Sequence, residues 1–419
     1  MAKVHEADVA AAENLEIQRT FYGKKENFLL CLPVLLLLFG TLLLFFLLPK
    51  DTYSKKENKE LPSVPEFSIE ALKNGMPDSG SSFQRFFKGT NSYIKEFVQD
   101  TVSYVKGHFP FREQLVEVNA AYDLLCGRMQ SNGIYPGKDG YLLEPDSADI
   151  DVPKFERTAA YIDSLLSADL PAVIAVPGNS SEVLKKKYPP FMDTTLLASN
   201  RALIDSAFQN KSYTYLNLSK TLSAHDEENI YFRTDHHWTA LGAYYASAEI
   251  LRAFGRSPAP LRDYRPETVM ENFCGTYYNR SGLFFLEGEA LTYLRYEGDE
   301  EYTVSFCKAN GEVESVSHSL YDRAALEPDY EGTAYDSFVA PVTTPVVKIE
   351  KEGEERPTLL VLKDSYAHST LSFLAQHYNL ITVDIRGNLG FAAQLVESGQ
   401  VDALLILASS STLLPKAES

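Results

Sequence analysis

This chain has few cysteines, and it has fewer basic than acidic residues. The cysteine content bears on disulfide bonding, and the charge bears on the classes of ligand that the protein binds. Its 419 residues include four cysteines and carry a formal net charge of -18. That charge argues against a nucleic-acid binder, because phosphate backbones are bound by basic surfaces. Cys31 lies in an apolar run. A disulfide between Cys274 and Cys307 would need an oxidising compartment, and three free thiols outside the apolar run fit the sequence as well.

Two common catalytic signatures are also absent. The chain has no G-x-S-x-G, the sharp turn that bears the serine of α/β-hydrolases, and no G-x-x-x-x-G-K-[ST] phosphate-binding loop. The composition, with 45% hydrophobic and 23% charged residues, is nevertheless that of a folded protein. A functional site must therefore be sought in other motifs.

One long apolar segment is present. "FLLCLPVLLLLFGTLLLFFLL", residues 28–48, contains no charged residue. About 20 apolar residues span the hydrocarbon core of a membrane, and no small-x-small cleavage site follows this segment. We predict an uncleaved transmembrane helix over 28–48, after a polar tail at 1–27. Lysines on both sides leave its orientation undecided by charge.

The chain after the apolar segment divides into two parts. Residues 49–110 are predicted to form a juxtamembrane linker and helix, with apolar residues at roughly helical spacing over 82–107. Residues 111–419 form the predicted main domain. Within it, residues 265–350 are rich in Tyr, Phe, Gly and acidic residues and alternate as strands do. We predict a β-rich insertion there.

Strands and helices alternate through the rest of the main domain. Near the end, predicted strands cover 358–365, 380–385 and 401–409, and predicted helices cover 366–378 and 389–398. This order predicts an α/β domain with a parallel sheet and helices on both of its faces. In such a sheet, ligands bind at the carboxyl ends of the strands.

"KDSYAHS" stands at one of these strand ends. Ser365 would lie where a strand ends and a helix begins, so its backbone N–H would belong to the unpaired first turn, which can stabilise an oxyanion. A serine hydroxyl becomes a nucleophile when a base takes its proton. Alternatively, Asp364 or Ser365 only caps the helix, a frequent role of both residue types.

The second polar stretch is "RTDHHWTALGAYYA", which follows a predicted strand at 229–233. In an extended segment residues i and i+2 point to the same side, so Asp235 and His237 would project together and His236 elsewhere. A carboxylate beside an imidazole orients the ring and stabilises its charged form, as a general base requires. Trp238, the only tryptophan, would wall the site and limit the access of water.

Two other interpretations use the same residues. Thr234 or Asp235 could cap the following helix and leave the histidines on the surface. Asp235, His236 and His237 could instead bind a metal ion, but adjacent histidines point apart and no other ligand cluster stands out. We expect no metal and no diffusible cofactor.

"YFRTDHHWTALGAYYA" resembles the signature of the bacterial DHHW proteins, which are named after this tetrapeptide. These proteins are similar to the AlgX/AlgJ group of SGNH-hydrolase-like proteins, in which a T-D-x-H-W motif is followed later by a strand ending in a serine, as in "LKDSYAHS" here. "HFPFR", "GKDGYLLE" and "VDIRG" also resemble stretches of the family. The resemblance covers nearly the whole chain.

The resemblance implies a fold and a set of roles. The fold would be an SGNH-hydrolase-like α/β/α sandwich with permuted motif blocks. Ser365 would be the nucleophile, His237 the base and Asp235 its orienting acid. No motif identifies the second donor of the oxyanion hole. Asn179 and the pair Arg386 and Asn388 are candidates for it or for substrate binding, with Trp238, although such residues also occur in turns and on surfaces.

A function follows from the same resemblance. The alginate proteins are polysaccharide O-acetyltransferases that act outside the membrane beside a membrane-bound O-acyltransferase. This chain would then be a single-pass cell-membrane protein with its tail in the cytoplasm, acetylating or deacetylating a cell-envelope polysaccharide. Its partners would be that polysaccharide, the lipid around the anchor and an acyl-donating acyltransferase, with no nucleic acid. The rival is a non-catalytic component that binds polysaccharide or assists assembly.

Overall fold

The computed structural model describes residues 24–68, 82–145, 149–166, 170–339, 344–387 and 389–417. The chain divides into two compact units, one formed by Met1–Ser54 and Glu60–Leu115, the other by Lys55–Lys59 and Val116–Ser419. Most of the predicted tail at 1–27 and the candidate Asn388 lie outside the described residues.

The first unit contains two long helices, α2 (Lys24–Leu47) and α4 (Ser82–Gly107). The stretch Phe28–Leu47 of α2 is long and apolar enough to cross a membrane, a property that it shares with signal sequences near an N-terminus. Helix α4 has the bounds predicted from its apolar spacing. Two short strands, β1 (Tyr53–Ser54) and β2 (Lys59–Glu60), pair with each other.

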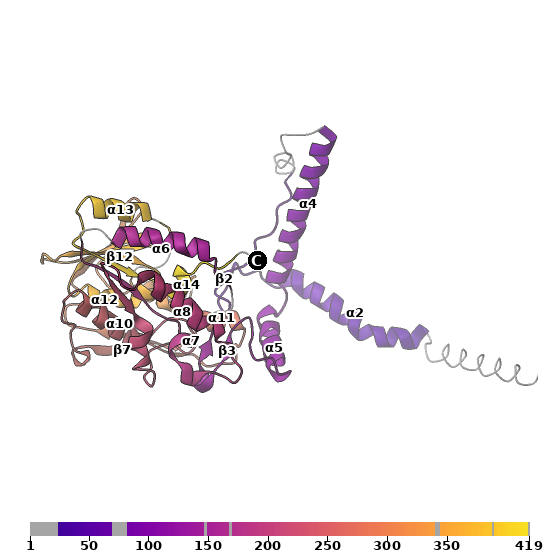
Figure 1. The fold of residues 1–419 in the computed structure, drawn as a ribbon. Coiled ribbons are helices and arrows are strands. Elements are labelled where there is room, and N and C mark those ends of the chain that lie inside the picture. The colour runs from indigo at the N-terminus through magenta and orange to yellow at the C-terminus, as the bar shows by residue number, and fades with distance from the viewer. Residues whose placement is uncertain are drawn as a thin grey trace, which may run out of the picture. The chain divides into compact units, whose positions relative to one another are not determined.

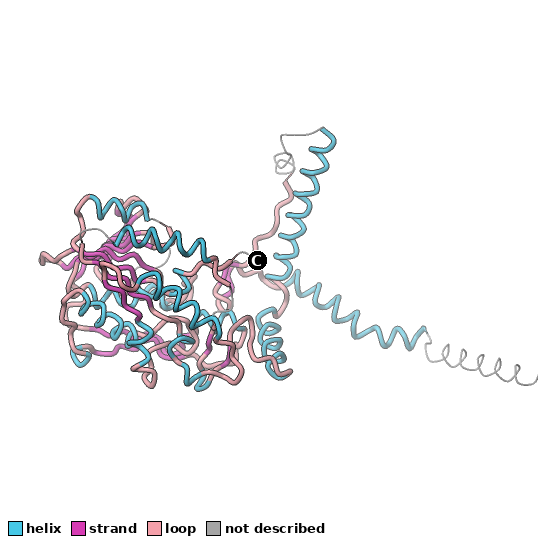
Figure 2. Tube along the Cα trace, viewed as in Figure 1, coloured by secondary structure: helices cyan, strands magenta, loops and turns pink. Residues whose placement is uncertain are grey.

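An eight-stranded sheet, in the order β10-β9-β11-β13-β12-β14-β5-β6, forms the centre of the second unit (Figures 1 and 2). Its five strands from β13 to β6 run parallel, as the alternating pattern predicts, and β11 continues the sheet antiparallel to β13. In chain order the strands are β5 (Ala172–Val176), β6 (Thr214–Asn217), β9 (Tyr302–Cys307), β10 (Val313–Ser317), β11 (Val346–Lys351), β12 (Thr358–Lys363), β13 (Asn379–Asp384) and β14 (Ala403–Leu407).

Two hydrophobic clusters lie on opposite faces of this sheet. Leu360 and Leu362 of β12 belong to one cluster with the apolar sides of α6, α8 and α13, and Leu359 and Val361 belong to the other with α9, α10 and α12. Alternate strand residues therefore bury both faces, as a doubly covered parallel sheet requires. The helices after residue 111 are α5 (Arg112–Leu125), α6 (Val152–Leu166), α7 (Ser180–Val183), α8 (Thr195–Phe208), α9 (Leu218–Ser223), α10 (Ala240–Ala253), α11 (Thr276–Ser281), α12 (Leu371–Leu374), α13 (Leu389–Glu397) and α14 (Ser410–Leu413).

The region predicted as a β-rich insertion is rich in strands, but most of it is not separate from the main sheet. Strands β9, β10 and β11 extend the parallel block as antiparallel strands. Among the residues of this region that the structure describes, β7 (Arg265–Phe273) and β8 (Glu289–Arg295) alone form a separate antiparallel pair, the β7–β8 hairpin. Another separate pair, β3 (Tyr135–Pro136) and β4 (Leu142–Leu143), lies earlier in the chain. Strand pairing over such distances leaves no local mark in the sequence, so alternation alone could not distinguish the two outcomes.

Two predicted elements turn out differently, and of the two alternatives left open for the cysteines the structure has free thiols. Residues 229–233 form no strand, and Tyr231 makes only an isolated bridge to Trp238. Residues 230–232 are apolar because the loop that they form is buried, not because it pairs in a sheet. The helix predicted over 366–378 is a 3₁₀ helix, η6 (Ser365–Thr370), followed by the single-turn α12. Cys274 and Cys307 are both free thiols.

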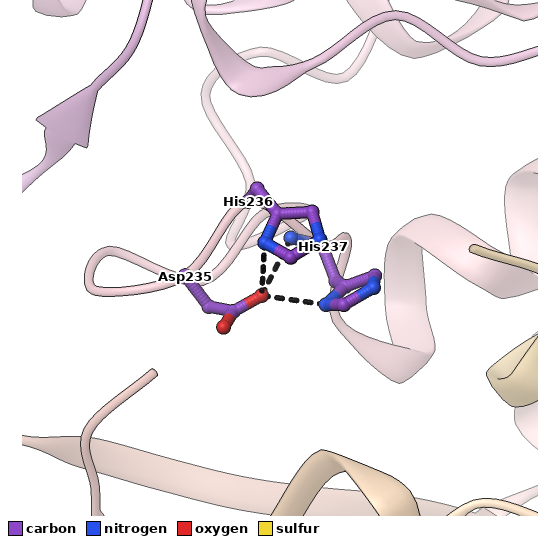
Figure 3. A group of neighbouring side chains, drawn as sticks. All are labelled: Asp235, His236 and His237. Carbon is purple, nitrogen blue, oxygen red and sulfur yellow. Dashed lines mark hydrogen bonds and ion pairs between the residues drawn. The ribbon is translucent and has the colours of Figure 1, made fainter. Parts of the chain in front are cut away.

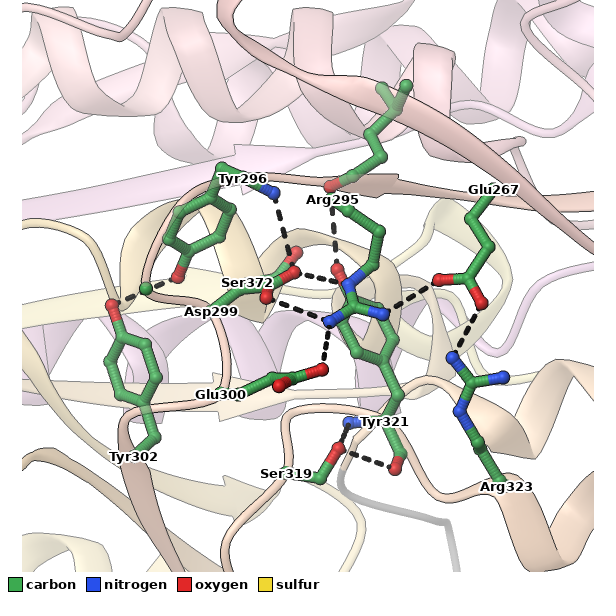
Figure 4. Close-up of polar contacts among 12 residues, drawn as sticks. Glu267, Arg295, Tyr296, Asp299, Glu300, Tyr302, Ser319, Tyr321, Arg323 and Ser372 are labelled. Atoms are coloured by element: carbon green, nitrogen blue, oxygen red, sulfur yellow. Dashed lines mark hydrogen bonds and ion pairs between the residues drawn. The ribbon is translucent and has the colours of Figure 1, made fainter.

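A network of charged side chains ties the β7–β8 hairpin to the following loop (Figure 4). Arg295 donates to Asp299 at 2.9 Å, to Glu300 at 2.7 Å and to Glu267 at 2.7 Å, and Glu267 also accepts from Arg323 at 2.6 Å. The Asp299 side chain is only 5% exposed. Removing one partner of a buried pair costs about 3–5 kcal/mol, so Arg295 acts as a structural residue of this hairpin.

Candidate active site

The turn after β12 presents Ser365. The Asp364 carboxylate caps this turn by accepting the Tyr366 N–H at 3.0 Å, and it also accepts the Ser409 N–H and hydroxyl, each at 2.7 Å, and the Thr412 hydroxyl at 2.8 Å. The buried Asp364 therefore joins the end of β12 to α14. Because Asp364 is the cap, the Ser365 hydroxyl remains available for another bond.

That hydroxyl bonds the second histidine of the D-H-H-W motif. The Oγ of Ser365 lies 2.8 Å from Nε2 of His237, and Nδ1 of His237 lies 2.6 Å from Oδ1 of Asp235. With Nδ1–H donated to the carboxylate, Nε2 of the neutral ring accepts the proton of the serine hydroxyl. Serine, histidine and aspartate thus form a continuous chain of hydrogen bonds with the arrangement of a catalytic triad, and we refer to these three residues as the triad; the aspartate and the histidine lie far ahead of the serine in sequence.

Asp235 is fully buried and held on both oxygens. Its Oδ1 also accepts the His237 N–H at 2.8 Å, and its Oδ2 accepts the Thr276 N–H at 2.6 Å. Burial raises the pKa of this carboxyl, but the two neighbouring imidazoles and these hydrogen bonds outweigh it and hold the pKa below its usual range. Gly275 permits the approach, since a Cβ there would lie 2.3 Å from Asp235. Asp235 therefore stays ionised beside the base.

Tyr335 covers His237, a contact that no pattern in the sequence predicts. Its ring stacks on that of His237 with centroids 3.9 Å apart and planes 7° apart. The Tyr335 hydroxyl lies 3.0 Å from Oγ of Ser369, which also accepts the indole N–H of Trp238 at 2.9 Å. Trp238 is fully buried, so it supports the motif from within and offers no surface to substrate.

The first histidine of the motif does not point away as the extended-segment argument predicts. Nδ1 of His236 lies 3.4 Å from Oδ1 of Asp235, and its ring centroid lies 3.8 Å from that of His237 (Figure 3). The segment bends instead of extending, so three successive side chains converge. Burial, followed by the neighbouring His237, lowers the pKa of His236 to about 4. Its imidazole is therefore neutral at pH 7.

A cavity of about 400 Å³ opens beside the triad. His236, Tyr366 and Thr276, neighbours of the three triad residues, line it, whereas Ser365 itself is not among its lining residues. The others are Glu144, Pro145, Ile150, Asn179, Asn200, Tyr277, Arg280, Ser411, Leu414 and Lys416. Most of these side chains are polar or aromatic, which suits a hydroxyl-rich ligand better than an apolar one.

Of the other residues predicted to bind substrate or an oxyanion, Asn179 lies at the cavity and Arg386 does not. Asn179 lines the cavity, where its Oδ1 accepts the Glu182 N–H at 3.0 Å and its Nδ2 donates to the Glu144 carbonyl at 3.2 Å. It caps α7 and keeps one amide hydrogen beyond these bonds. Arg386 makes a bidentate pair with Asp384 and does not line the cavity.

One observation supports the interpretation of the D-H-H side chains as a metal site. One ligand-type atom from each of Asp235, His236 and His237 lies within 4.8 Å of the others. Asp235 and His237 are, however, already hydrogen-bonded to each other and to Ser365. A bound ion would have to displace those bonds.

A buried basic pair lies behind the triad. Nε2 of His368 is 3.1 Å from Nζ of Lys363, and each residue is 1% exposed. Burial, and then the Lys363 charge, hold the pKa of His368 well below its usual value. Burial also lowers the pKa of Lys363 to about 8, although Asp384 and Asp364 raise it in part.

This pair predicts a loss of stability at mildly acid pH. An unfolded histidine takes up a proton near pH 6.5, whereas folded His368 stays neutral, so the unfolded state binds more protons below that pH. We expect the contribution of His368 to the free energy of unfolding to fall with decreasing pH, with a slope of about 0.7 kcal/mol per pH unit at pH 6.5 that approaches about 1.4 kcal/mol per pH unit at pH 5. Urea titrations between pH 7.5 and 5 measure the slope. His368→Gln should flatten it, His318→Gln on the surface should not, and equal slopes for all three proteins would refute the prediction.

Comparison with known proteins identifies the family. The model of the family described as DHHW protein matches residues 173–384, just over half of the 419 residues. The chain belongs to the DHHW family. The matched region contains the motif after which the DHHW proteins are named and Ser365, and thus every member of the triad.

Solved structures share the fold. A DHHW family protein from Eubacterium siraeum superimposes with a TM-score of 0.56 at 21% identity, covering 68% of this chain and 94% of that one. Bacillus cereus PatB1, solved with a sulfonyl adduct, superimposes with a TM-score of 0.55 at 19% identity, covering 68% of this chain and 96% of PatB1. The O-acetyltransferase domain of Pseudomonas putida AlgJ superimposes with a TM-score of only 0.43 at 13% identity, covering 68% of this chain and 94% of that domain. No curated protein matches the sequence.

Proposed function

We propose that this DHHW protein is a membrane-anchored, extracytoplasmic O-acetyltransferase or acetylesterase that acts on a cell-envelope polysaccharide. The observation on which this rests is the chain of hydrogen bonds from Ser365 through His237 to the buried Asp235. Such a chain activates a serine for attack on an acyl group.

In the first half-reaction Ser365 Oγ attacks the carbonyl carbon of an acyl donor. The serine proton passes to Nε2 of His237 and then to the leaving group, and an acetyl-serine remains. In the second half-reaction a sugar hydroxyl or water attacks the acetyl group, and His237 takes that proton and returns it to Ser365 Oγ. Asp235 stabilises the imidazolium that forms in each half.

Different observations support the other parts of the proposal. PatB1, which shares the fold, carries a sulfonyl adduct, the product expected where a sulfonyl reagent meets an activated nucleophile. The resemblance of the D-H-H-W and D-S motifs to the AlgX/AlgJ group supports acetyl transfer to polysaccharide with a membrane-bound acyltransferase as donor. The apolar stretch Phe28–Leu47 supports an anchor that leaves the catalytic unit outside the membrane.

The test is the mass of the intact full-length protein in detergent after brief exposure to 4-nitrophenyl acetate. We expect one added acetyl group, located by peptide mapping to Ser365. No adduct and no ester turnover would favour the rival role in polysaccharide binding or assembly. Stoichiometric zinc in the purified protein, with activity lost on chelation, would favour a metal-dependent hydrolase built on the histidine pair.

A further inference from the structure

His236 is the one member of the D-H-H-W motif that neither the triad nor the core uses. Asp235 and His237 belong to the triad and Trp238 is buried, whereas the His236 side chain is 31% exposed and lines the cavity. Tyr366, next to the nucleophile, donates its hydroxyl to the His236 carbonyl at 2.5 Å and so fixes the backbone there. The ring is held at the entrance to the triad.

The hydrogen-bonding capacity of His236 is also defined. Its Nδ1 lies beside the ionised Asp235, so the neutral ring carries its proton on Nδ1 and leaves a lone pair on Nε2. Within the parts of the chain that the structure describes, no hydrogen bond to Nε2 of His236 is found. Nε2 can therefore accept a hydrogen bond from a ligand in the cavity.

The cavity-lining ring of His236 thus lies against the ring of His237, which bonds Ser365. Nε2 of His237 accepts the proton of the attacking hydroxyl during transfer, and the ring of His236 lies 3.8 Å from that of His237. One hydroxyl cannot donate its single proton to both rings. A pair of hydroxyl groups on adjacent carbons supplies two protons close together, one for each ring.

We propose that His236 positions the acceptor by accepting a hydrogen bond from the hydroxyl next to the attacking one, and that the preferred acceptor is a sugar with free hydroxyl groups on adjacent carbons. This inference rests on the proposed function. The attacking oxygen forms a bond to the acetyl carbon of acetyl-Ser365, and the bond from that carbon to Ser365 Oγ breaks. The proton of the attacking hydroxyl passes through His237 to Ser365 Oγ. The neighbouring hydroxyl keeps its own proton and donates it in a hydrogen bond to Nε2 of His236.

The experiment measures how the acetyl-enzyme divides between sugar and water. Full-length protein turns over 4-nitrophenyl acetate with methyl glucoside as acceptor, and the ratio of acetylated sugar to free acetate is recorded. The 3-deoxy glucoside retains hydroxyls at carbons 2, 4 and 6, none of them adjacent. The 6-deoxy glucoside also lacks one hydroxyl but keeps adjacent ones, so it is the matched control.

We expect the wild type to give a ratio about tenfold lower with the 3-deoxy than with the 6-deoxy sugar, the effect of one lost hydrogen bond in a formed site. His236→Phe should lower the ratio for methyl glucoside by about tenfold and should no longer distinguish the two deoxy sugars. His236→Gln, which keeps an acceptor oxygen, should recover part of the preference. His318→Phe, the same change at an exposed histidine, should behave as wild type.

Three results would overturn the inference. In the first, the wild type uses the two deoxy sugars equally. In the second, His236→Phe retains the wild-type preference, which means that another group reads the neighbouring hydroxyl. In the third, acetyl-Ser365 forms but passes only to water, which removes this inference and leaves the nucleophile in place. A wild type that never forms acetyl-Ser365 would instead overturn the proposed function, and this inference with it.

Discussion

Ser365→Ala is expected to take up no acetyl group and to turn over 4-nitrophenyl acetate about 10⁶-fold more slowly than the wild type, as triad knockouts do elsewhere. The reason is that the hydroxyl bonded to Nε2 of His237 is the proposed nucleophile, and without it the acetyl-serine cannot form. Stopped-flow absorbance at the nitrophenolate band gives the rate, and intact mass gives the adduct.

The controls for this prediction separate the triad from general damage. His237→Ala should cost nearly as much as Ser365→Ala, and the double variant should be no slower than either, because residues that act as a unit are not additive. Ser398→Ala, at an exposed serine after α13, should keep wild-type rates. An acetylated Ser365→Ala protein would show that another side chain is the nucleophile.

Asp235→Asn is expected to lower kcat by about 10³- to 10⁴-fold with little change in KM. The carboxylate accepts Nδ1–H of His237 at 2.6 Å, which keeps Nε2 free to take the serine proton. An asparagine amide at this place can donate to Nδ1 instead, and the proton then resides on Nε2, where the ring cannot act as a base. Because neither Asp235 nor its partner Thr276 N–H forms the nucleophile, labelling of Ser365 should be slow but complete.

Progress curves at several ester concentrations separate kcat from KM for this variant. Asp226→Asn is the matched control. Asp226 is a surface acid whose carboxylate accepts a hydrogen bond from Lys186 at 3.1 Å, and it does not belong to the triad. A loss of less than about tenfold in Asp235→Asn would mean that His237 keeps its tautomer without the carboxylate. His237 would then be oriented by its stacking on Tyr335 alone.

The parts of this site that short motifs encode could be predicted. Ser365 follows β12, as the strand pattern required. Asp235 and His237 meet as predicted, although they do so in a bend and not in the extended segment from which their i, i+2 spacing was argued. The family resemblance supplied the pairing of the two motifs, which are 128 residues apart in sequence and which no periodicity connects.

The parts of the site that depend on contacts between distant residues could not be predicted from the sequence. Tyr335 reaches His237 from a 3₁₀ turn with an ordinary capping box, and no local pattern marks such a turn as part of an active site. His236 was misplaced because the segment before it was taken as an extended strand. The bend that turns it back towards Asp235 follows residues 230–232, which are buried in the core.

The position of β12 in the sheet has a consequence for motion. β12 is hydrogen-bonded to β13 on one side and to β14 on the other, so its amides should be among the slowest in the protein to exchange with solvent. His236 and Tyr335 instead stand on a bend and on a 3₁₀ turn, where local opening takes less free energy. The side of the site that bears His236 and Tyr335 is therefore expected to open to solvent more often than β12, the strand that leads to the serine.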